Sequence, residues 1–395
     1  MLNGPFSPWP DFDAAEKQAV LDVLNSNKVN YWTGQQGREF EKQFAAYVDT
    51  SYAVAVANGT VALDLAWQAL NLPIGSEVIV TSRTFIASIS SIVLAGLTPV
   101  FADIDRDTQN ISAATITPLI SDKTSAILCV HLAGWPCEMD EILALAKGHQ
   151  LYVVEDCAQA HGATYKSKPV GGLGDIAAWS FCQDKIMTTA GEGGMVTTNN
   201  KQLWEKVWSF KDHGKSWQAI YEKEHPPGFR WLHESFGTNW RMMEMQAAVG
   251  LKQLEKMPSW TAIRNKYSQQ IFATAQSFDA LRVPEIPDYI EHAFYKCYVF
   301  VKPENLNSGW DRDRIIAELT QLAIPCFSGS CSEVYKEKAF DGTNYRPKKA
   351  LVNAIELGET SLMFLVHPTL KQHEMDLCCE KFSSVMQQAS KEFNL

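Results

Sequence analysis

The chain has 395 residues, of which 46% are hydrophobic and 20% are charged, and its net charge is -10. These values are ordinary for a globular protein, and the length allows two domains with sizeable cores. The excess of acids and the lack of a basic run argue against a nucleic acid as a partner.

Cysteine spacing and hydropathy narrow the class of protein further. The nine cysteines form no C-x-x-C pair, and no Cys/His group has the spacing of zinc ligands, so we expect reduced thiols and no metal site. The N-terminus MLNGPFSPWPDFD lacks the basic and apolar regions of a signal peptide. No apolar run approaches the roughly 20 residues that span a bilayer. We therefore expect a soluble, cytoplasmic protein without a membrane partner.

Two amphipathic helices are predicted near the N-terminus, at residues 13–25 and 37–48, because their apolar residues recur at helical spacing. A polar turn between them contains Tyr31 and Trp32. These two aromatic side chains either belong to the core or line a pocket.

Short apolar strands alternate with helical patterns beyond residue 50. Near-continuous apolar strands, most of them followed by a helix, are typical of a buried and mainly parallel sheet. The pattern therefore predicts one large α/β domain. Its strands are expected at residues 53–57, 78–81, 99–102, 126–131, 151–155, 176–181 and 195–198, and helices at 61–69, 86–95 and 138–147.

The pattern of predicted elements changes in the C-terminal third of the sequence. A long helix is predicted from residue 242 to 256 and on past Pro258, and longer irregular links appear after residue 286. The elements expected there are a strand at 292–301, a helix at 312–322, a strand at 323–327 and a helix at 374–388. We therefore place a large α/β domain at residues 1–255 and a smaller C-terminal α+β domain at 256–395.

An acid and a lysine near the ends of two predicted strands indicate the chemistry. Asp156 follows the apolar run 151–155, and Lys185 lies just beyond 176–181. Strand ends of a parallel sheet share one edge, so both side chains can reach one molecule in the crevice there. Pyridoxal 5'-phosphate needs such a pair, because a lysine forms a Schiff base with its aldehyde and an acid keeps its ring nitrogen protonated. We predict Lys185 and Asp156 as catalytic residues and pyridoxal phosphate as the cofactor.

The phosphate of that cofactor needs hydroxyl groups and backbone amides, preferably at the start of a helix. Asn58, Gly59 and Thr60 directly follow a predicted strand and open the predicted helix 61–69. A helix-capping turn is the simpler interpretation, but a cap can also be the anion site. We therefore predict Gly59 and Thr60 as phosphate ligands.

Three sequence blocks carry a resemblance to a known family. They are E-D-x-A-Q-A-x-G-A at residues 155–163, G-D-x-x-x-x-S-F-x-x-x-K at 174–185 and G-E-G-G at 191–194. In residues and spacing they resemble the DegT/DnrJ/StrS family of pyridoxal-phosphate-dependent sugar aminotransferases. The similarity extends from about residue 30 to 253 and, more weakly, to the C-terminus. It implies the fold type I aminotransferase architecture.

The resemblance assigns roles to four further cofactor-binding residues. Phe85 would stack on the ring, the Gln159 amide would reach the ring hydroxyl, and Ser180 would give the phosphate a second hydroxyl. Asn239 stands in an N-x-R-M block, whose asparagine reaches the phosphate of the neighbouring subunit in that family. This last role implies a homodimer with shared active sites. Core packing is the alternative for Phe85, and an ordinary helical glutamine is the alternative for Gln159.

The resemblance also implies the reaction, which is transfer of an amino group from glutamate, with glutamine as the alternative donor, to a nucleotide-linked ketosugar. A 4-keto-6-deoxyhexose is the expected acceptor, with a 3-keto sugar as the alternative, and the amino sugar would enter a surface polysaccharide or a glycosylated natural product. The rival functions are a sugar dehydratase and a non-catalytic regulatory protein on the same scaffold. Dehydratases of this type usually carry histidine in place of Lys185. A nicotinamide dehydrogenase would need G-x-G-x-x-G, and Gly59 stands alone.

Several residues keep two interpretations. His161 either lines the pocket or packs, and Glu192 supports the glycine turn rather than moving protons. Trp135 and Trp240 either contact the substrate or pack. The candidates for binding the nucleotide phosphates are Lys215, Arg230 and Arg241, and the segment 328–333 is a candidate substrate loop.

Overall fold

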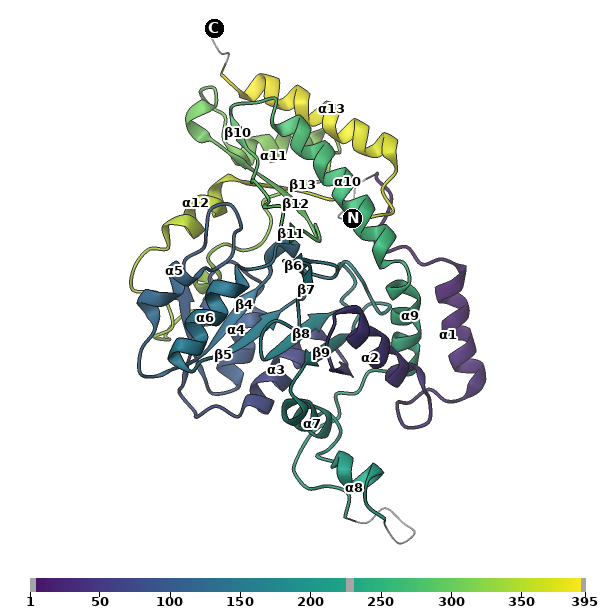
Figure 1. Ribbon diagram of the computed structural model, residues 1–395. Helices are drawn as coiled ribbons and strands as arrows, with labels where there is room; N and C mark the ends of the chain where they lie inside the picture. The colour runs from purple at the N-terminus through teal and green to yellow at the C-terminus, as the bar shows by residue number, and fades with distance from the viewer. Residues whose placement is uncertain (1–4, 225–230, 392–395) are drawn as a thin grey trace.

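A seven-stranded sheet forms the centre of the larger part of the molecule (Figure 1). The computed structural model describes residues 5–224 and 231–391. The strands are β1 (Tyr52–Val56), β2 (Glu77–Thr81), β3 (Thr98–Ala102), β4 (Thr124–Val130), β5 (Tyr152–Asp156), β8 (Ile176–Ser180) and β9 (Gly194–Thr198). They lie in the order β1-β9-β8-β5-β4-β2-β3, and β9 is antiparallel to both of its neighbours while the other pairs are parallel. The predicted sheet of seven mostly parallel strands is confirmed.

Helices cover both faces of this sheet, which explains why its strands are apolar throughout. In β8, Ile176 and Ala178 belong to a core shared with helix α3 (Gly59–Leu70), whereas Ala177 and Trp179 belong to a second core shared with α2 (Gln36–Tyr47). Alternate residues of a strand point to opposite faces, so the two cores lie on opposite sides. The other helices of this part are α1 (Ala14–Ser26), α4 (Ala87–Leu94), α5 (Ala113–Ile116), α6 (Met139–His149), α7 (Lys201–Phe210), α8 (Trp217–Tyr221) and α9 (Glu244–Leu254).

The long helix predicted across Pro258 is wrong in one respect, because the chain breaks it in two. Helix α9 ends at Leu254, and α10 (Met257–Ala275) begins after a short turn with Pro258 in its first turn. Proline has no amide proton and its ring would clash with the carbonyl four residues before it, so it is tolerated only where a new helix starts. The break redirects the chain toward the C-terminal part.

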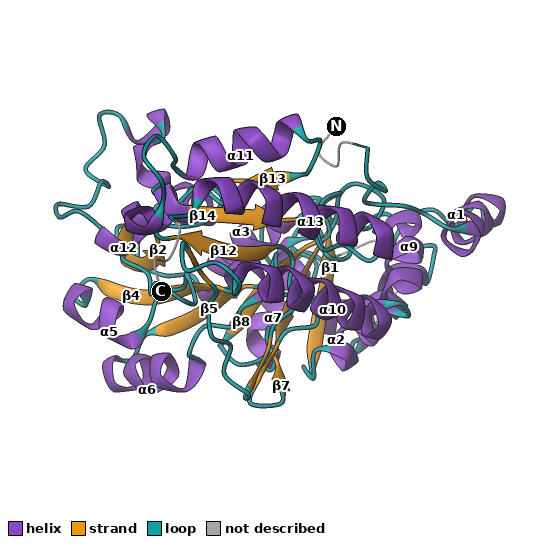
Figure 2. Ribbon diagram, turned by 90° about the horizontal axis from the view of Figure 1, so that it is seen from above, coloured by secondary structure: helices purple, strands orange, loops and turns teal. Residues whose placement is uncertain are grey.

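A four-stranded antiparallel sheet organises the C-terminal part, in the order β10-β12-β14-β13. Its strands are β10 (Leu281–Arg282), β12 (Cys297–Val301), β14 (Ser361–Phe364) and β13 (Cys326–Phe327), and its helices are α11 (Arg312–Gln321), α12 (Val352–Thr360) and α13 (Gln372–Ala389). Seen from above, α11 and α13 lie against this sheet (Figure 2). Cys297 and Val299 face the core under these helices, whereas Tyr298 and Phe300 face the larger part. The predicted division at residue 255 remains a prediction.

Some predicted elements differ from those observed. The strand predicted at 292–301 begins only at Cys297, because the backbone turns at Phe294, whose φ is 46°. The strand predicted at 323–327 shrinks to Cys326–Phe327, since Ala323 adopts a left-handed conformation after α11. Helices α7 and α12, strand β14 and a small sheet of β11 (Ile290–Glu291), β6 (Thr164–Tyr165) and β7 (Lys168–Pro169) were not predicted. No helix in the described ranges is long and apolar enough to cross a bilayer.

Candidate active site

A cavity of about 1050 Å³ lies where β5 and β8 end and α3 begins. Residues of β12, of the segment after β13 and of β14 close its other side. Seven of the eight residues predicted to bind the cofactor line it, namely Gly59, Thr60, Phe85, Asp156, Gln159, Ser180 and Lys185. The fold therefore brings together side chains that are up to 126 positions apart in the sequence.

Asp156 is the last residue of β5 and is 6% exposed. The Ser88 hydroxyl donates to its Oδ2 at 2.8 Å, and the Ala158 amide donates to its Oδ1 at 3.1 Å. Burial raises the pKa of this carboxyl group, although both hydrogen bonds and the charge of Lys185 oppose that shift. A buried carboxylate of this kind gains by pairing with a cation in the cavity.

Lys185 lies in the loop after β8, where its amide donates to the Cys182 carbonyl at 3.0 Å. Its Nζ is 3.9 Å from Asp184 Oδ1 and 5.0 Å from the centre of the Tyr295 ring. The Tyr295 hydroxyl donates to the other oxygen of Asp184. Burial opposes the charge on Asp184, but Lys185 and this hydroxyl outweigh it and lower its pKa. The lysine amine thus has a fixed carboxylate beside it and space in front of it.

The start of α3 forms one end of the cavity. Asn58 caps the helix by accepting from the Val61 amide at 3.0 Å, and the first amides of a helix have no partner within it. A Cβ atom added to Gly59 would lie 2.5 Å from Ser180 Cβ, so this close approach of α3 to β8 requires glycine. Thr60 is exposed, and Ser180 is mostly buried. Two hydroxyls and a helix N-terminus suit a phosphate group.

Phe85 and Gln159 line the same cavity between its two ends. The Phe85 ring is 69% exposed, so one of its faces is free to stack on a planar ligand. The Gln159 Oε1 accepts from the Ala133 amide at 2.7 Å, which fixes the side chain and leaves its Nε2 group to donate to a ligand. Both orientations suit the roles that were predicted for these residues.

Asn239, Lys215 and Arg241 are described by the structure and do not line this cavity. Asn239 is exposed and pairs through a backbone bridge with Asp212. The Asp212 carboxylate is 2.5 Å from Arg241 and 3.3 Å from Lys215. Arg230 lies outside the described residues. Because Asn239 was expected to act in a neighbouring subunit, its role stays a prediction.

Most of the other undecided side chains pack rather than face the cavity. Tyr31 is buried and bonded to Glu41, and the Trp32 indole donates to Asp212 at 2.7 Å. Trp135 is buried and Trp240 packs against Phe210.

His161 is buried against the rings of Phe44, Trp179 and Phe181, and burial lowers its pKa to about 3. The Glu192 carbonyl accepts from Thr189 and Gln246, so this residue does support the glycine turn.

The sequence did not reveal the residues on the far side of the cavity, except for the candidate loop. Ser328, Gly329, Ser330 and Cys331 of that loop do line it. The Ser330 amide donates to the Tyr298 hydroxyl at 3.0 Å, which anchors the loop to β12. The unpredicted lining residues include Trp9, Ser88, Asp184, Tyr295, Lys296, Tyr298, Met363, Leu365 and His367. No local motif marks them, although Asp184 directly precedes Lys185.

His131, Glu155 and Cys157 form a buried group whose ligand atoms lie within 4.8 Å of one another. The Cys137 amide donates to His131 Nδ1, so His131 Nε2 carries the proton and donates to Glu155 at 3.0 Å. Three amides of the loop from Gly171 to Gly174 also donate to Glu155. With its acceptor atoms engaged in this way, the group stabilises the protein around Asp156 rather than offering ligands to a metal.

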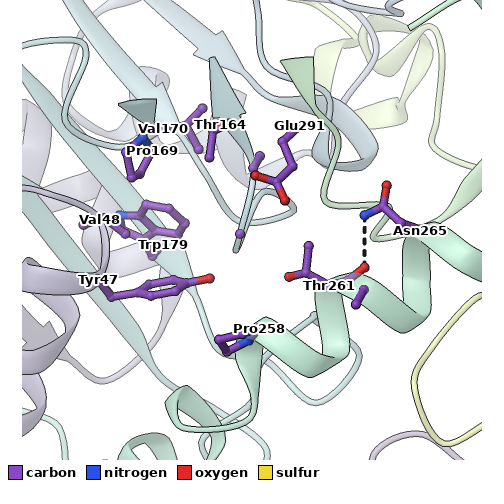
Figure 3. A pocket seen from close by; sticks show the side chains of 13 residues that line it. Tyr47, Val48, Thr164, Pro169, Val170, Trp179, Pro258, Thr261, Asn265 and Glu291 are labelled. Carbon is purple, nitrogen blue, oxygen red and sulfur yellow. Dashed lines mark hydrogen bonds between the residues drawn. The ribbon is translucent and has the colours of Figure 1, made fainter. Parts of the chain in front are cut away.

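A second cavity, of about 440 Å³, lies on the other side of Trp179, between α2 and α10. Figure 3 shows the side chains of Tyr47, Thr261 and Glu291 around it. Neither Lys185 nor Asp156 lines this cavity. The catalytic candidates therefore belong to the larger cavity alone.

Comparison with known proteins assigns the chain to a protein family. A sequence profile of the DegT/DnrJ/EryC1/StrS aminotransferase family matches residues 10–383. The chain belongs to this family. It is accordingly an enzyme, a sugar aminotransferase of a family that depends on pyridoxal phosphate.

Individual relatives agree with this family. GDP-perosamine synthase of Caulobacter vibrioides is 39% identical over 80% of this chain and 81% of that protein. GDP-perosamine synthase of Escherichia coli O157:H7 is 44% identical over 62% of this chain and 65% of that protein, so the chain matches just under two thirds of this relative. The crystal structure of an aminotransferase from Psychrobacter cryohalolentis is 58% identical, covers 97% of this chain and 99% of its own, and superposes with a TM-score of 0.96. The fold type I architecture is confirmed.

Proposed function

We propose that the larger cavity binds pyridoxal phosphate and that this aminotransferase moves an amino group from glutamate to a nucleotide-linked 4-keto-6-deoxyhexose. The observation that carries the proposal is the placement of Lys185, Asp156 and the α3 N-terminus around one cavity. These groups match, in order, the aldehyde, the ring nitrogen and the phosphate of the cofactor.

The residues fit the cofactor in their chemistry as well as in their placement. Asp156 is a buried acid that needs a cationic partner, and Gly59 allows the start of α3 to approach Ser180 closely. When bound, pyridoxal phosphate supplies an electron sink that stabilises negative charge on the carbon from which a proton is removed. Asp156 would hold the ring nitrogen in its protonated form, since the pair of opposite charges in a buried place is worth several kcal/mol.

The proton transfers would fall to Lys185. Its Nζ would hold the aldehyde of the cofactor and, when free, would carry a proton as base in one half-reaction and as acid in the other. The Asp184 carboxylate lies 3.9 Å from this nitrogen. Phe85 and Gln159 would orient the ring, and Trp9 adds an indole to the wall of the cavity.

The relatives support the choice of acceptor. Two of them are named GDP-perosamine synthases, which supports a nucleotide-linked sugar as the acceptor. A cavity of about 1050 Å³ has room for the cofactor and a sugar together. The dehydratase alternative is not favoured, because a lysine stands at position 185. The amino sugar would then enter a surface polysaccharide or a glycosylated product.

The proposal includes a homodimer with shared sites, in which Asn239 contacts the phosphate bound by the neighbouring subunit. Its support is the exposure of Asn239 and its position outside the chain's own cavity. Asn239→Ala should then weaken cofactor binding without changing the fold of the single chain, and the molecular mass in solution should be that of two chains.

The first experiment is the visible absorption spectrum of the purified protein with pyridoxal phosphate, recorded before and after glutamate. We expect an absorption band of the bound cofactor that glutamate depletes. The glutamate-treated protein is then given 4-keto and 3-keto sugars linked to GDP, dTDP or UDP, and the product is assigned by NMR. A product with nitrogen on C3 would overturn the choice of acceptor, and a band that ignores glutamate would overturn the choice of donor.

A further inference from the structure

Lys296 places an ammonium group in the wall of the active-site cavity without a partner of opposite charge. It lies just before β12 and lines the cavity. Asp184 is the acid whose charge acts on it, yet in the described part of the chain no carboxylate comes within ion-pair distance of its Nζ. Lys296 is half-buried, and a cation that loses water without gaining a counter-ion is costly, so this group is a candidate for binding a ligand.

The strand geometry explains why this side chain faces the cavity. Lys296 and Tyr298 are two positions apart, and both line it. On the neighbouring strand and its extension, Met363, Leu365 and His367 follow the same two-residue period and also line it. Side chains along a strand alternate between faces, so one face of this small sheet supplies the far wall of the cavity.

Two positions behind Lys296, the backbone is held in place by a buried arginine. Arg264 of α10 donates from one guanidinium nitrogen to the carbonyls of Phe294 and Tyr295, at 3.2 and 3.4 Å. This guanidinium is buried and adds a second positive charge behind Lys296. The backbone next to Lys296 is therefore anchored, and Arg264 and Lys185 act on its ammonium group as positive charges, which Asp184 opposes.

The position of Lys296 relative to Lys185 suggests what it binds. Both ammonium groups lie over the Tyr295 ring, at 5.0 Å for Lys185 and 4.7 Å for Lys296. One oxygen of Asp184 accepts from the Tyr295 hydroxyl and the other lies near Lys185, and among the described residues Asp184 forms no ion pair with Lys296. Lys296 is thus free to bind an anion that sits next to the carbon on which Lys185 acts.

We propose that Lys296 binds a carboxylate of the amino donor. This inference rests on the proposed function and adds the residue that recognises glutamate. The α-carboxylate of an amino acid is attached to the carbon that loses the proton, so an anion-binding group belongs close to the lysine that removes it. The phosphates of a nucleotide sugar are less suitable, because the sugar ring separates them from C4.

The same residue would allow one site to take two different substrates. Glutamate brings carboxylates, whereas the sugar brings hydroxyl groups to the same place. Burial, Arg264 and Lys185 lower the pKa of Lys296 to about 8, although Asp184 opposes them. A lysine with a pKa in this range binds a carboxylate as a cation and can lose its charge at little cost when a neutral sugar replaces it.

The experiment measures binding of glutarate, which has the two carboxylates of glutamate but no amino group to react. Titration calorimetry on the cofactor-loaded protein at pH 7 compares wild type with Lys296→Met and Lys296→Arg. Lys123→Met, which removes an exposed lysine outside the cavity, is the matched control. We expect Lys296→Met to weaken glutarate binding at least about 10-fold, the range for losing a charged hydrogen bond, while the arginine variant and the control stay within a few fold.

A second measurement tests whether the effect of Lys296→Met is specific to glutamate, the proposed amino donor. In single turnovers, Lys296→Met should raise the glutamate concentration for half-maximal rate and leave that for the ketosugar within a few fold. Glutarate affinity that is unchanged in Lys296→Met would overturn the proposal, and so would an equal loss for both substrates. If wild type binds glutarate through Lys296 but does not react with glutamate, the proposed function fails while the carboxylate subsite stands. If the methionine variant does not fold, Lys296→Gln provides the comparison.

Discussion

The two walls of the active-site cavity are built in different ways. The wall that holds the proposed cofactor consists of residues at strand ends and a helix start in the large sheet, such as Gly59, Asp156 and Ser180. The opposite wall consists of alternate residues from the small sheet and the loop after β13, such as Lys296, Gly329 and His367. Under the proposed function, the first wall would serve the chemistry of both substrates, whereas the second would face the parts in which the substrates differ.

This difference between the two walls indicates which of them should determine substrate specificity. Groups on the first wall follow strands that are fixed by the buried sheet, so their placement changes little when loops change. Groups on the second wall depend on how the C-terminal part sits on the large sheet and on a loop anchored by one tyrosine hydroxyl. Mutations on the first wall should therefore impair both half-reactions, and mutations on the second wall should separate them.

The strongest test of the first wall is Lys185→Ala. We expect the loss of the cofactor's characteristic absorption and a fall in turnover of at least about 1000-fold, because the variant lacks both the attachment point and the proton carrier. Lys123→Ala, an exposed lysine outside the cavity, should behave as wild type in absorption and in turnover. A Lys185→Ala protein that kept both properties would remove the assignment of the catalytic lysine.

Asp156→Asn should have the next largest effect, a fall in turnover of about 100- to 1000-fold in both half-reactions. Asparagine keeps the shape and can still accept from Ser88, but it cannot hold a positive charge on the ring nitrogen. Cofactor occupancy, measured by absorbance, should fall less than turnover. Asp175→Asn is the control, since Asp175 is half-buried and accepts from the Val153 amide but lies outside the cavity. Turnover that Asp156→Asn leaves unchanged would exclude the electron-sink role.

The large sheet and the C-terminal part also differ in how well their elements could be predicted from the sequence. All seven strands of the large sheet were predicted to within a few residues, because each is a short apolar run next to turn residues. Strand β12 was predicted five residues too long, since apolar composition does not reveal the turn at Phe294. The helix pair around Pro258 was predicted as one, although proline in a helix is a known signal for a break.

The candidate site was predictable on one wall only. Lys185, Asp156 and Gly59 stand at strand ends or at a helix start, where sequence order alone brings side chains together. Lys296 precedes β12 and His367 follows β14, and the paired residues of these two strands lie 61 to 67 positions apart in the sequence. Nothing near Lys296 or His367 in the sequence marks them as neighbours of Lys185. Trp9, whose indole donates to the Lys185 carbonyl at 2.9 Å, was likewise missed. Such contacts arise from tertiary packing, which local patterns do not encode.

Gly329→Ala should disturb the second wall alone and therefore impair the reaction with the ketosugar but not the reaction with glutamate. The glycine has a φ of 85°, and an added Cβ would lie 2.4 Å from the Tyr298 ring, so the substrate loop must move. We expect kcat/KM for the ketosugar to fall about 10- to 100-fold, the range for misplaced binding groups, while the reaction with glutamate changes by less than a few fold. Gly342→Ala has a similar φ of 75° with open space around it, and it controls for backbone strain. Equal losses with both substrates would contradict the separation of the walls.

The pH dependence of glutarate binding is the smallest effect and the sharpest test of the second wall. Because the pKa of Lys296 is lowered to about 8, the residue is charged below that pH and loses its charge above it. Glutarate needs the charged form, so its Kd should be constant from pH 6 to 7 and rise toward about tenfold per unit well above 8.

The groups that face Lys296 do not give the same profile. Asp184 has a lowered pKa and stays charged, and burial raises the pKa of Tyr295 well above this range. His367 has a pKa lowered to about 2, chiefly by burial, and stays neutral. Lys185 and Arg264 are the other cations nearby. In Lys296→Arg the guanidinium stays charged throughout, so the rise above pH 8 should vanish. If the arginine variant keeps the rise, a group other than Lys296 causes it, and the carboxylate-binding charge does not belong to Lys296.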